Sequence, residues 1–84
     1  MTVRLTDRGE ILLEDTCPSE DAEILLQKLS ADPDAPVDLR ACEFAHTAVI
    51  QVLMAAMPKV LGPPAGLALR DWVYPILARR SVSD

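Results

Sequence analysis

Few side chains in this sequence could carry chemistry, and Cys17, Cys42 and His46 are the first to consider. The two cysteines are widely separated and lack the paired spacing of a zinc ribbon. A metal site built from both cysteines and His46 would be one ligand short of a closed tetrahedral site. We therefore predict reduced, half-buried thiols, no metal and no cofactor. A disulfide is the less favoured alternative because the N-terminus carries no secretion signal.

His46 and Thr47 lie at the start of an apolar stretch, "FAHTAVIQVLMAAM", residues 44–57. No acidic residue stands beside His46 to orient it as a base, so we interpret it as a turn residue bonded to backbone. Thr47 has two interpretations. It could cap a helix through its hydroxyl oxygen, or it could be a phosphoacceptor. A phosphate at the positive end of a helix would be tolerated by the helix but not by an apolar partner docked there.

The sequence offers no other arrangement typical of an enzyme. It has no Gly-rich phosphate loop, no credible pair of carboxylates and no nucleophile next to a base. The segment "GPPAG" (62–66) predicts a turn, because its prolines remove the N–H donors that a phosphate cradle supplies. We therefore expect a protein that is not an enzyme.

Composition narrows the class further. The 84 residues suit one small domain, 1–84, and the net charge of −5 without a basic stripe argues against nucleic acid. The longest apolar run, Val52–Met57, is far shorter than the roughly 20 residues of a membrane span. We expect a soluble, cytoplasmic protein with no direct membrane insertion.

The N-terminal half predicts a hairpin, a helix and a strand. Val3 and Leu5 alternate with polar residues, residues 7–9 form a turn, and residues 10–14 form a second strand. The continuous "ILL" (11–13) suggests a strand covered on both faces. Ser19 is the expected N-cap of a helix whose apolar residues recur at helical spacing. After the "SADPDAP" loop, "VDLRAC" (37–42) predicts the third strand.

The C-terminal half predicts a helix over 47–57, a strand over 65–70 and a last helix capped by Asp71, with Pro75 in or just past its first turn. The order β-β-α-β-α-β-α indicates an α/β fold with a small mixed four-stranded sheet and three helices. From the second strand onward, we expect right-handed parallel crossovers with helices packed on the sheet.

The helix at 47–57 is unusually apolar, since only Thr47 and Gln51 are polar and they lie on one side, four residues apart. A helix that is apolar all round is either buried or bound. One interpretation is a central helix tucked between neighbours. The other is that one side stays open for a partner.

The segment "VDLRACEFAHTAVIQVLMAA" resembles the STAS domain (sulfate transporter and anti-sigma factor antagonist). That family has a strand ending in Asp-Leu-Ser or similar, a Phe or Ile, then Asp-Ser/Thr-Ser/Ala-Gly-Leu and a long apolar helix. Here His46 stands where the family has Asp, Thr47 where its regulatory Ser or Thr falls, and Val49 and Ile50 replace Gly-Leu. The motif match spans residues 37–57, whereas the order of elements agrees over most of the chain.

The resemblance implies a compact STAS-like domain that binds partners and does not catalyse. Family members dock a kinase-like anti-sigma factor, or the ATPase subunit of a lipid-transport ABC system, around that hydroxyl residue. It predicts bacterial signal transduction as an anti-sigma factor antagonist, with Thr47 as the phosphoacceptor. The alternatives are a structural or assembly module that homodimerises through helix 47–57, or an accessory subunit of an ABC transporter. The predicted partner-binding residues are Glu43, His46, Thr47, Ile50, Gln51 and Met54.

Overall fold

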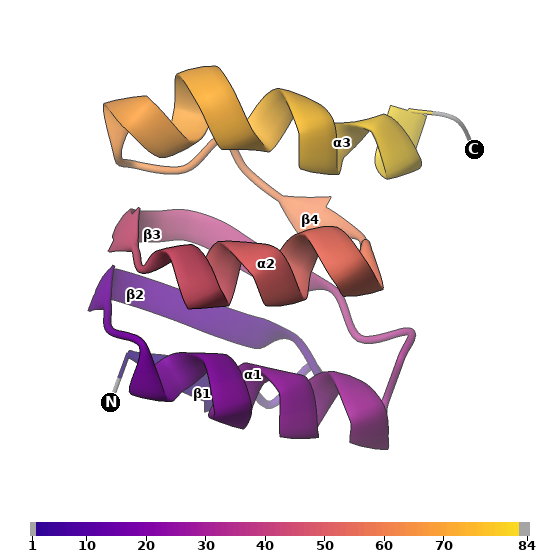
Figure 1. Cartoon of the computed structure of the whole chain (residues 1–84). Helices are drawn as coiled ribbons and strands as arrows, with labels where there is room; N and C mark the ends of the chain where they lie inside the picture. The colour runs from indigo at the N-terminus through magenta and orange to yellow at the C-terminus, as the bar shows by residue number, and fades with distance from the viewer. Residues whose placement is uncertain (1, 83–84) are drawn as a thin grey trace.

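A computed structural model describes residues 2–82 and shows a mixed four-stranded sheet with three helices, which confirms the predicted fold class (Figure 1). The sheet order is β1-β2-β3-β4, with β1 antiparallel to β2 and the other two pairs parallel. The elements are β1 (Val3–Leu5), β2 (Ile11–Cys17), α1 (Glu20–Ala31), β3 (Val37–Ala45), α2 (Thr47–Ala56), β4 (Val60–Leu61), a π-helical turn (Leu69–Val73) and α3 (Tyr74–Val82).

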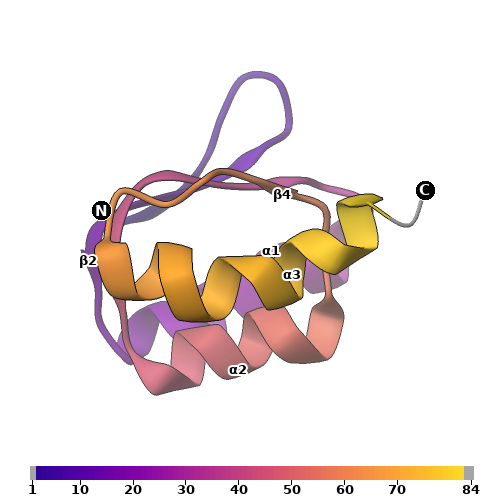
Figure 2. The ribbon, with the colours of Figure 1, turned by 90° about the horizontal axis from the view of Figure 1, so that it is seen from above.

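All three helices cover the same face of the sheet (Figure 2). The crossovers through α1 and α2 step in one direction across that face, so they have the same hand. The prediction that residues 11–13 are covered on both faces is wrong. Ile11 and Leu13 are fully buried, whereas Leu12, paired with the exposed Arg4, is only half-buried on the uncovered face.

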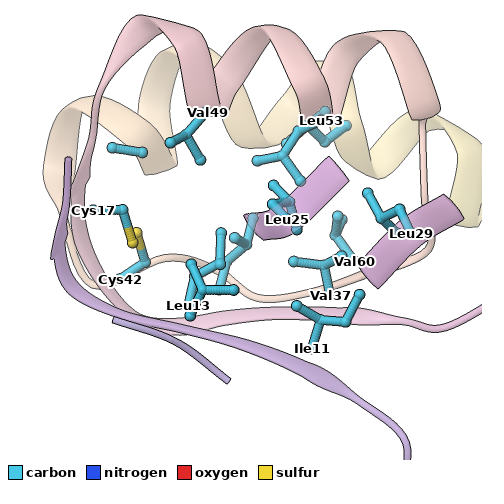
Figure 3. Close-up of a cluster of buried hydrophobic side chains, with 14 of the residues drawn as sticks. Ile11, Leu13, Cys17, Leu25, Leu29, Val37, Cys42, Val49, Leu53 and Val60 are labelled. Atoms are coloured by element: carbon cyan, nitrogen blue, oxygen red, sulfur yellow. The ribbon is translucent and has the colours of Figure 1, made fainter. Parts of the chain in front are cut away.

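The hydrophobic core fills the space between the sheet and the helices (Figure 3). Each helix supplies one strip of side chains to it, since strands and helices in a two-layer fold bury one face each. The fully or nearly fully buried side chains from α1 and α2 are Leu25, Leu29, Val49 and Leu53. They pack over strand residues that include Ile11, Leu13, Val37 and Val60.

The fourth strand is not where the sequence predicted it. It is β4, which pairs with β3 through Val37↔Val60, and the N–H of Val37 donates to the carbonyl of Lys59 at 2.8 Å. Residues 65–70 are not a strand. Gly66 makes one strand-like bond, from its N–H to the carbonyl of Cys42 (3.1 Å), and its own carbonyl then accepts from the N–H of Arg70 (2.9 Å) as a helix begins.

The C-terminal helical segment therefore starts before Asp71, which is not its N-cap. Leu69 and Leu77 are buried and Val73 is half-buried, which is helical spacing rather than strand alternation. Pro75 lies inside the segment, directly after the π turn in which the N–H of Tyr74 donates to the carbonyl of Leu69. The wider turn leaves room for the proline ring, which would otherwise press on the carbonyl of Asp71.

A buried carboxylate supports a bulge in β3. Leu12 pairs with Asp38 but Glu14 pairs with Ala41, so β3 has one extra residue in between. Within this bulge the N–H of Arg40 donates to Oδ1 of Asp38 at 3.0 Å. The Arg40 guanidinium binds both carboxylate oxygens, at 3.0 and 2.9 Å. These hydrogen bonds lower the pKa of Asp38 below its usual value.

The lowered pKa of Asp38 predicts a specific loss of stability in acid. The ionised Asp38 carboxylate stabilises the folded protein at pH values above the unfolded-state pKa, about 3.9. This stabilisation is lost as the pH falls through the lower folded-state pKa. We expect Asp38→Asn to reduce the free energy of unfolding by about 1 kcal/mol at pH 7, and by much less at pH 2. Urea denaturation at both pH values measures this difference.

The control is Glu14→Gln, which removes the carboxylate paired with Arg4 (2.8 Å) on the same uncovered face. The Glu14 carboxylate is more exposed than that of Asp38, so we expect a smaller change at pH 7. An equal loss for Asp38→Asn at both pH values would show that the carboxylate charge does not stabilise the bulge.

Candidate partner-binding surface

The start of α2 is capped by His46, not by Thr47. Nδ1 of His46 accepts a hydrogen bond from the N–H of Ala48 at 3.0 Å, and the carbonyl of His46 accepts from Val49 and Ile50. Nδ1 is bonded to Cγ, the same position that the Oδ1 of Asn or Asp occupies in a usual cap. The prediction that His46 bonds to backbone is confirmed, and the interpretation of Thr47 as the N-cap is wrong.

Thr47 is the first residue of α2, and its side chain is exposed. It is adjacent to the first-turn N–H groups, which lack partners within the helix. Because the cap is supplied by His46, the Thr47 hydroxyl is not required for helix initiation. A group added to that hydroxyl would therefore face solvent and the positive end of the helix dipole.

The helix α2 is not enclosed by its neighbours. Of its ten residues only Val49 and Leu53 are buried, so the interpretation of a helix tucked in on every side is wrong. Thr47, Gln51 and Met54 are exposed and Ile50 is half-buried. Their spacing, i, i+3, i+4 and i+7, places all four on one side of the helix. We call this set, together with His46, the α2 face.

Glu43 is the one predicted partner-binding residue that stands apart from the α2 face. It is exposed in β3, directly after the inward-facing Cys42. Strand alternation directs its side chain to the opposite side of the sheet from Cys42. Its main chain lies against Gly66, where an added Cβ would meet the carbonyl of Glu43.

An apolar groove between α1 and α2 was not predicted. From α1 it includes Leu26, whose exposed fraction is 51%. Its lining residues are Ala22, Leu26, Ala48, Gln51, Val52, Ala55 and Ala56. The sequence signal was the width of the apolar stripe of α1, since only Leu25 and Leu29 of its apolar residues are buried. The groove extends the α2 face toward α1 through the shared residue Gln51.

The C-terminal helical segment carries a second exposed apolar surface that the sequence analysis also missed. Trp72 is 78% exposed, and Ile76, one helical turn later, is 42% exposed. The buried residues Leu69 and Leu77 hold this segment on the core from the other side. Helical spacing of large apolar side chains therefore did not indicate burial for Trp72 and Ile76.

The two cysteines are free thiols and are fully buried, not half-buried as predicted. Within residues 2–82 no group of three or more histidine, cysteine or acidic side chains is arranged to hold a metal ion. In the same range, no helix combines the length and apolar character needed to cross a membrane.

The cap geometry predicts different effects for two substitutions of His46. We expect His46→Ala to lower the free energy of unfolding by about 1 kcal/mol, because the N–H of Ala48 loses its acceptor. His46→Asn keeps an acceptor at the same position and should change stability by less than about 0.5 kcal/mol. Equilibrium urea denaturation compares the two variants, and equal destabilisation by both would show that the imidazole acts by packing instead.

Comparison with known proteins adds no assignment to this geometry: no protein-family model matches the chain, and no curated protein or solved structure does.

Proposed function

We propose that this protein is a non-catalytic, STAS-type binding module that docks a regulatory partner on the α2 face and is switched at Thr47. The observation that carries the proposal is the exposure of an almost wholly apolar helix. α2 buries only Val49 and Leu53, and its apolar residues Met54, Ala55 and Ala56 are exposed together with the polar Thr47 and Gln51. The resemblance of residues 37–57 to the STAS motif supports the same surface.

The chemistry of the α2 face suits docking by a second protein. Met54 is flexible and polarisable, so it adapts to different apolar neighbours. The alanines of the adjoining groove allow a partner helix to approach closely. Gln51 supplies hydrogen-bonding groups that can orient the contact. No proton transfer or nucleophilic attack is needed for this role.

Phosphorylation of Thr47 would release such a partner without unfolding the helix. The phosphate adds nearly two negative charges beside the N-terminus of α2, where the helix dipole favours negative charge. A docked apolar surface would have to desolvate that phosphate, which strongly disfavours binding. We propose a kinase-like anti-sigma factor or another regulatory ATPase as the partner, and the cytoplasm as the location.

A homodimer formed through α2 is the second candidate, and the groove favours it. Ala22, Ala48 and Ala55 line a shallow apolar channel into which a helix from another copy could pack. In that arrangement the α2 face would serve assembly rather than signalling.

The switch is tested with a purified kinase or ATPase encoded beside this protein's gene. We expect Thr47→Glu to weaken binding by at least about tenfold, or 1.4 kcal/mol, in isothermal titration calorimetry. Thr47→Val keeps the size of the side chain without charge and should bind as the wild type does. Thr16→Glu, which places the same charge on the exposed end of β2, is the matched control. Equal binding by Thr47→Glu and wild type would refute the switch.

The two candidates are separated by sedimentation velocity over a wide dilution range. A monomer at all concentrations supports the signalling module. A concentration-independent dimer that Met54→Asp dissociates supports the assembly module instead, because the charge would then lie in the dimer interface.

A further inference from the structure

Cys17 and Cys42 meet in the core, although they are far apart in the sequence. They lie on the adjacent parallel strands β2 and β3, near the end from which the chain enters α1 and α2. Their sulfur atoms point toward each other beneath the helices (Figure 3). Both side chains have an exposed fraction of 0%.

An irregularity in the sheet brings the two thiols together. Asp15 pairs with Cys42 and Cys17 pairs with Ala45, with a register shift between Asp15 and Thr16. Asp15 has a φ of 54°, the left-handed region that a non-glycine residue adopts only at some conformational cost. The chain thus departs from regular strand geometry beside Cys42: Asp15 is exposed, and Cys17 faces the core as the earlier inward residues of β2 do.

We propose that Cys17 and Cys42 form a redox site, which a small hydroperoxide such as hydrogen peroxide converts to an intramolecular disulfide. The site needs no third residue, because the two facing thiols supply both sulfur atoms of the disulfide and the two electrons that pass to the peroxide. Whether this bond also controls partner docking rests on the function proposed above.

The reaction balances in two steps. The Cys17 thiolate attacks one peroxide oxygen, the O–O bond breaks, and a sulfenic acid and one water form after proton uptake. The Cys42 sulfur then attacks the Cys17 sulfur, the S–O bond breaks, and the hydroxyl leaves with the Cys42 proton as a second water. Overall, two thiols and one H₂O₂ give one disulfide and two waters, with two electrons passing from sulfur to peroxide.

The hydrogen bond between the thiols assigns the order of attack. It lowers the pKa of Cys17, whereas the same contact together with burial raises the pKa of Cys42. Cys17 is therefore the thiol that loses its proton more readily, and we assign Cys42 as the resolving thiol. Full burial selects the oxidant by size, since a mixed disulfide with glutathione would need space that the packed core does not have.

The bond would act on the start of α2. The N–H of His46, the N-cap residue, donates to the carbonyl of Cys17 at 2.9 Å. The carbonyl of Cys42 accepts from the N–H of Gly66, where the C-terminal helical segment begins. A disulfide would join β2 to β3 covalently at the point where both contacts originate.

The test treats the folded protein with hydrogen peroxide and identifies the products by intact mass and peptide mapping. We expect a monomer lacking two hydrogens, with Cys17 linked to Cys42 and the change reversed by dithiothreitol. With the folded protein, oxidised glutathione should react more slowly than hydrogen peroxide, by on the order of tenfold or more. In urea, this difference between the two oxidants should vanish. Cys42→Ser is the matched control and should stop at oxidised Cys17 without a disulfide.

Intermolecular disulfides, sulfinic acid as the first product, or no reaction of the folded protein would each overturn the redox site. Amide hydrogen exchange then tests the link to α2, and we expect altered protection from Thr47 to Ile50 in the oxidised protein. Unchanged exchange there would overturn the link alone. Neither measurement uses a binding partner, so failure of the redox site is distinguishable from failure of the proposed docking function.

Discussion

The covering of only one face of the sheet is the constraint from which the other features follow. With α1, α2 and α3 on the same side, the protein has a single core layer and each helix can bury one strip. For α2 that strip is Val49 and Leu53, although nearly every residue of the helix is apolar. Beyond the strip, Ile50 and Val52 pack partly against the core, whereas Met54 and the two alanines that follow it are exposed. The exposed apolar side chains are the physical reason for proposing that a partner binds α2.

His46 joins the sheet to that helix through both its main chain and its side chain. Its N–H bonds to Cys17 at the end of β2, and its Nδ1 bonds to Ala48 in the first turn of α2. The position of Thr47 is consequently set by a residue held to the sheet rather than by a mobile loop. A surface that begins beside such an anchor is preorganised, which lowers the entropy lost when a partner binds.

The sequence predicted those parts of the fold that depend on local patterns. The hairpin and the helix after Ser19 follow from periodicity, and the strand and helix of residues 37–57 follow from short apolar runs; all are found. The fourth strand was misplaced because Leu67 and Leu69 fit strand alternation as well as a helix. Only the packing of Leu69 with Leu77 against the core decides between them. The two residues of β4 are too few to show any period.

The candidate site was predicted in part for the same reason. The spacing of Thr47, Ile50, Gln51 and Met54 on one helix face is a local property, and the structure has it. The meeting of Cys17 with Cys42 depends on strand order and on two register shifts, which no local pattern reveals. The cap was misassigned because threonine is a common N-cap and histidine is not, whereas the backbone geometry made His46 the last non-helical residue.

The histidine at this position also bears on how a phosphate at Thr47 would behave. Where the STAS motif has Asp, the negative charge of a carboxylate adjoins the phosphoacceptor. In this chain the cap is Nδ1 of an imidazole, which must be unprotonated at that nitrogen to accept from Ala48 and adds no negative charge. A phosphate on Thr47 would therefore avoid repulsion from its neighbour and interact with the helix dipole directly. Compared with an Asp at this position, His46 gives a start of α2 that accommodates added negative charge more readily.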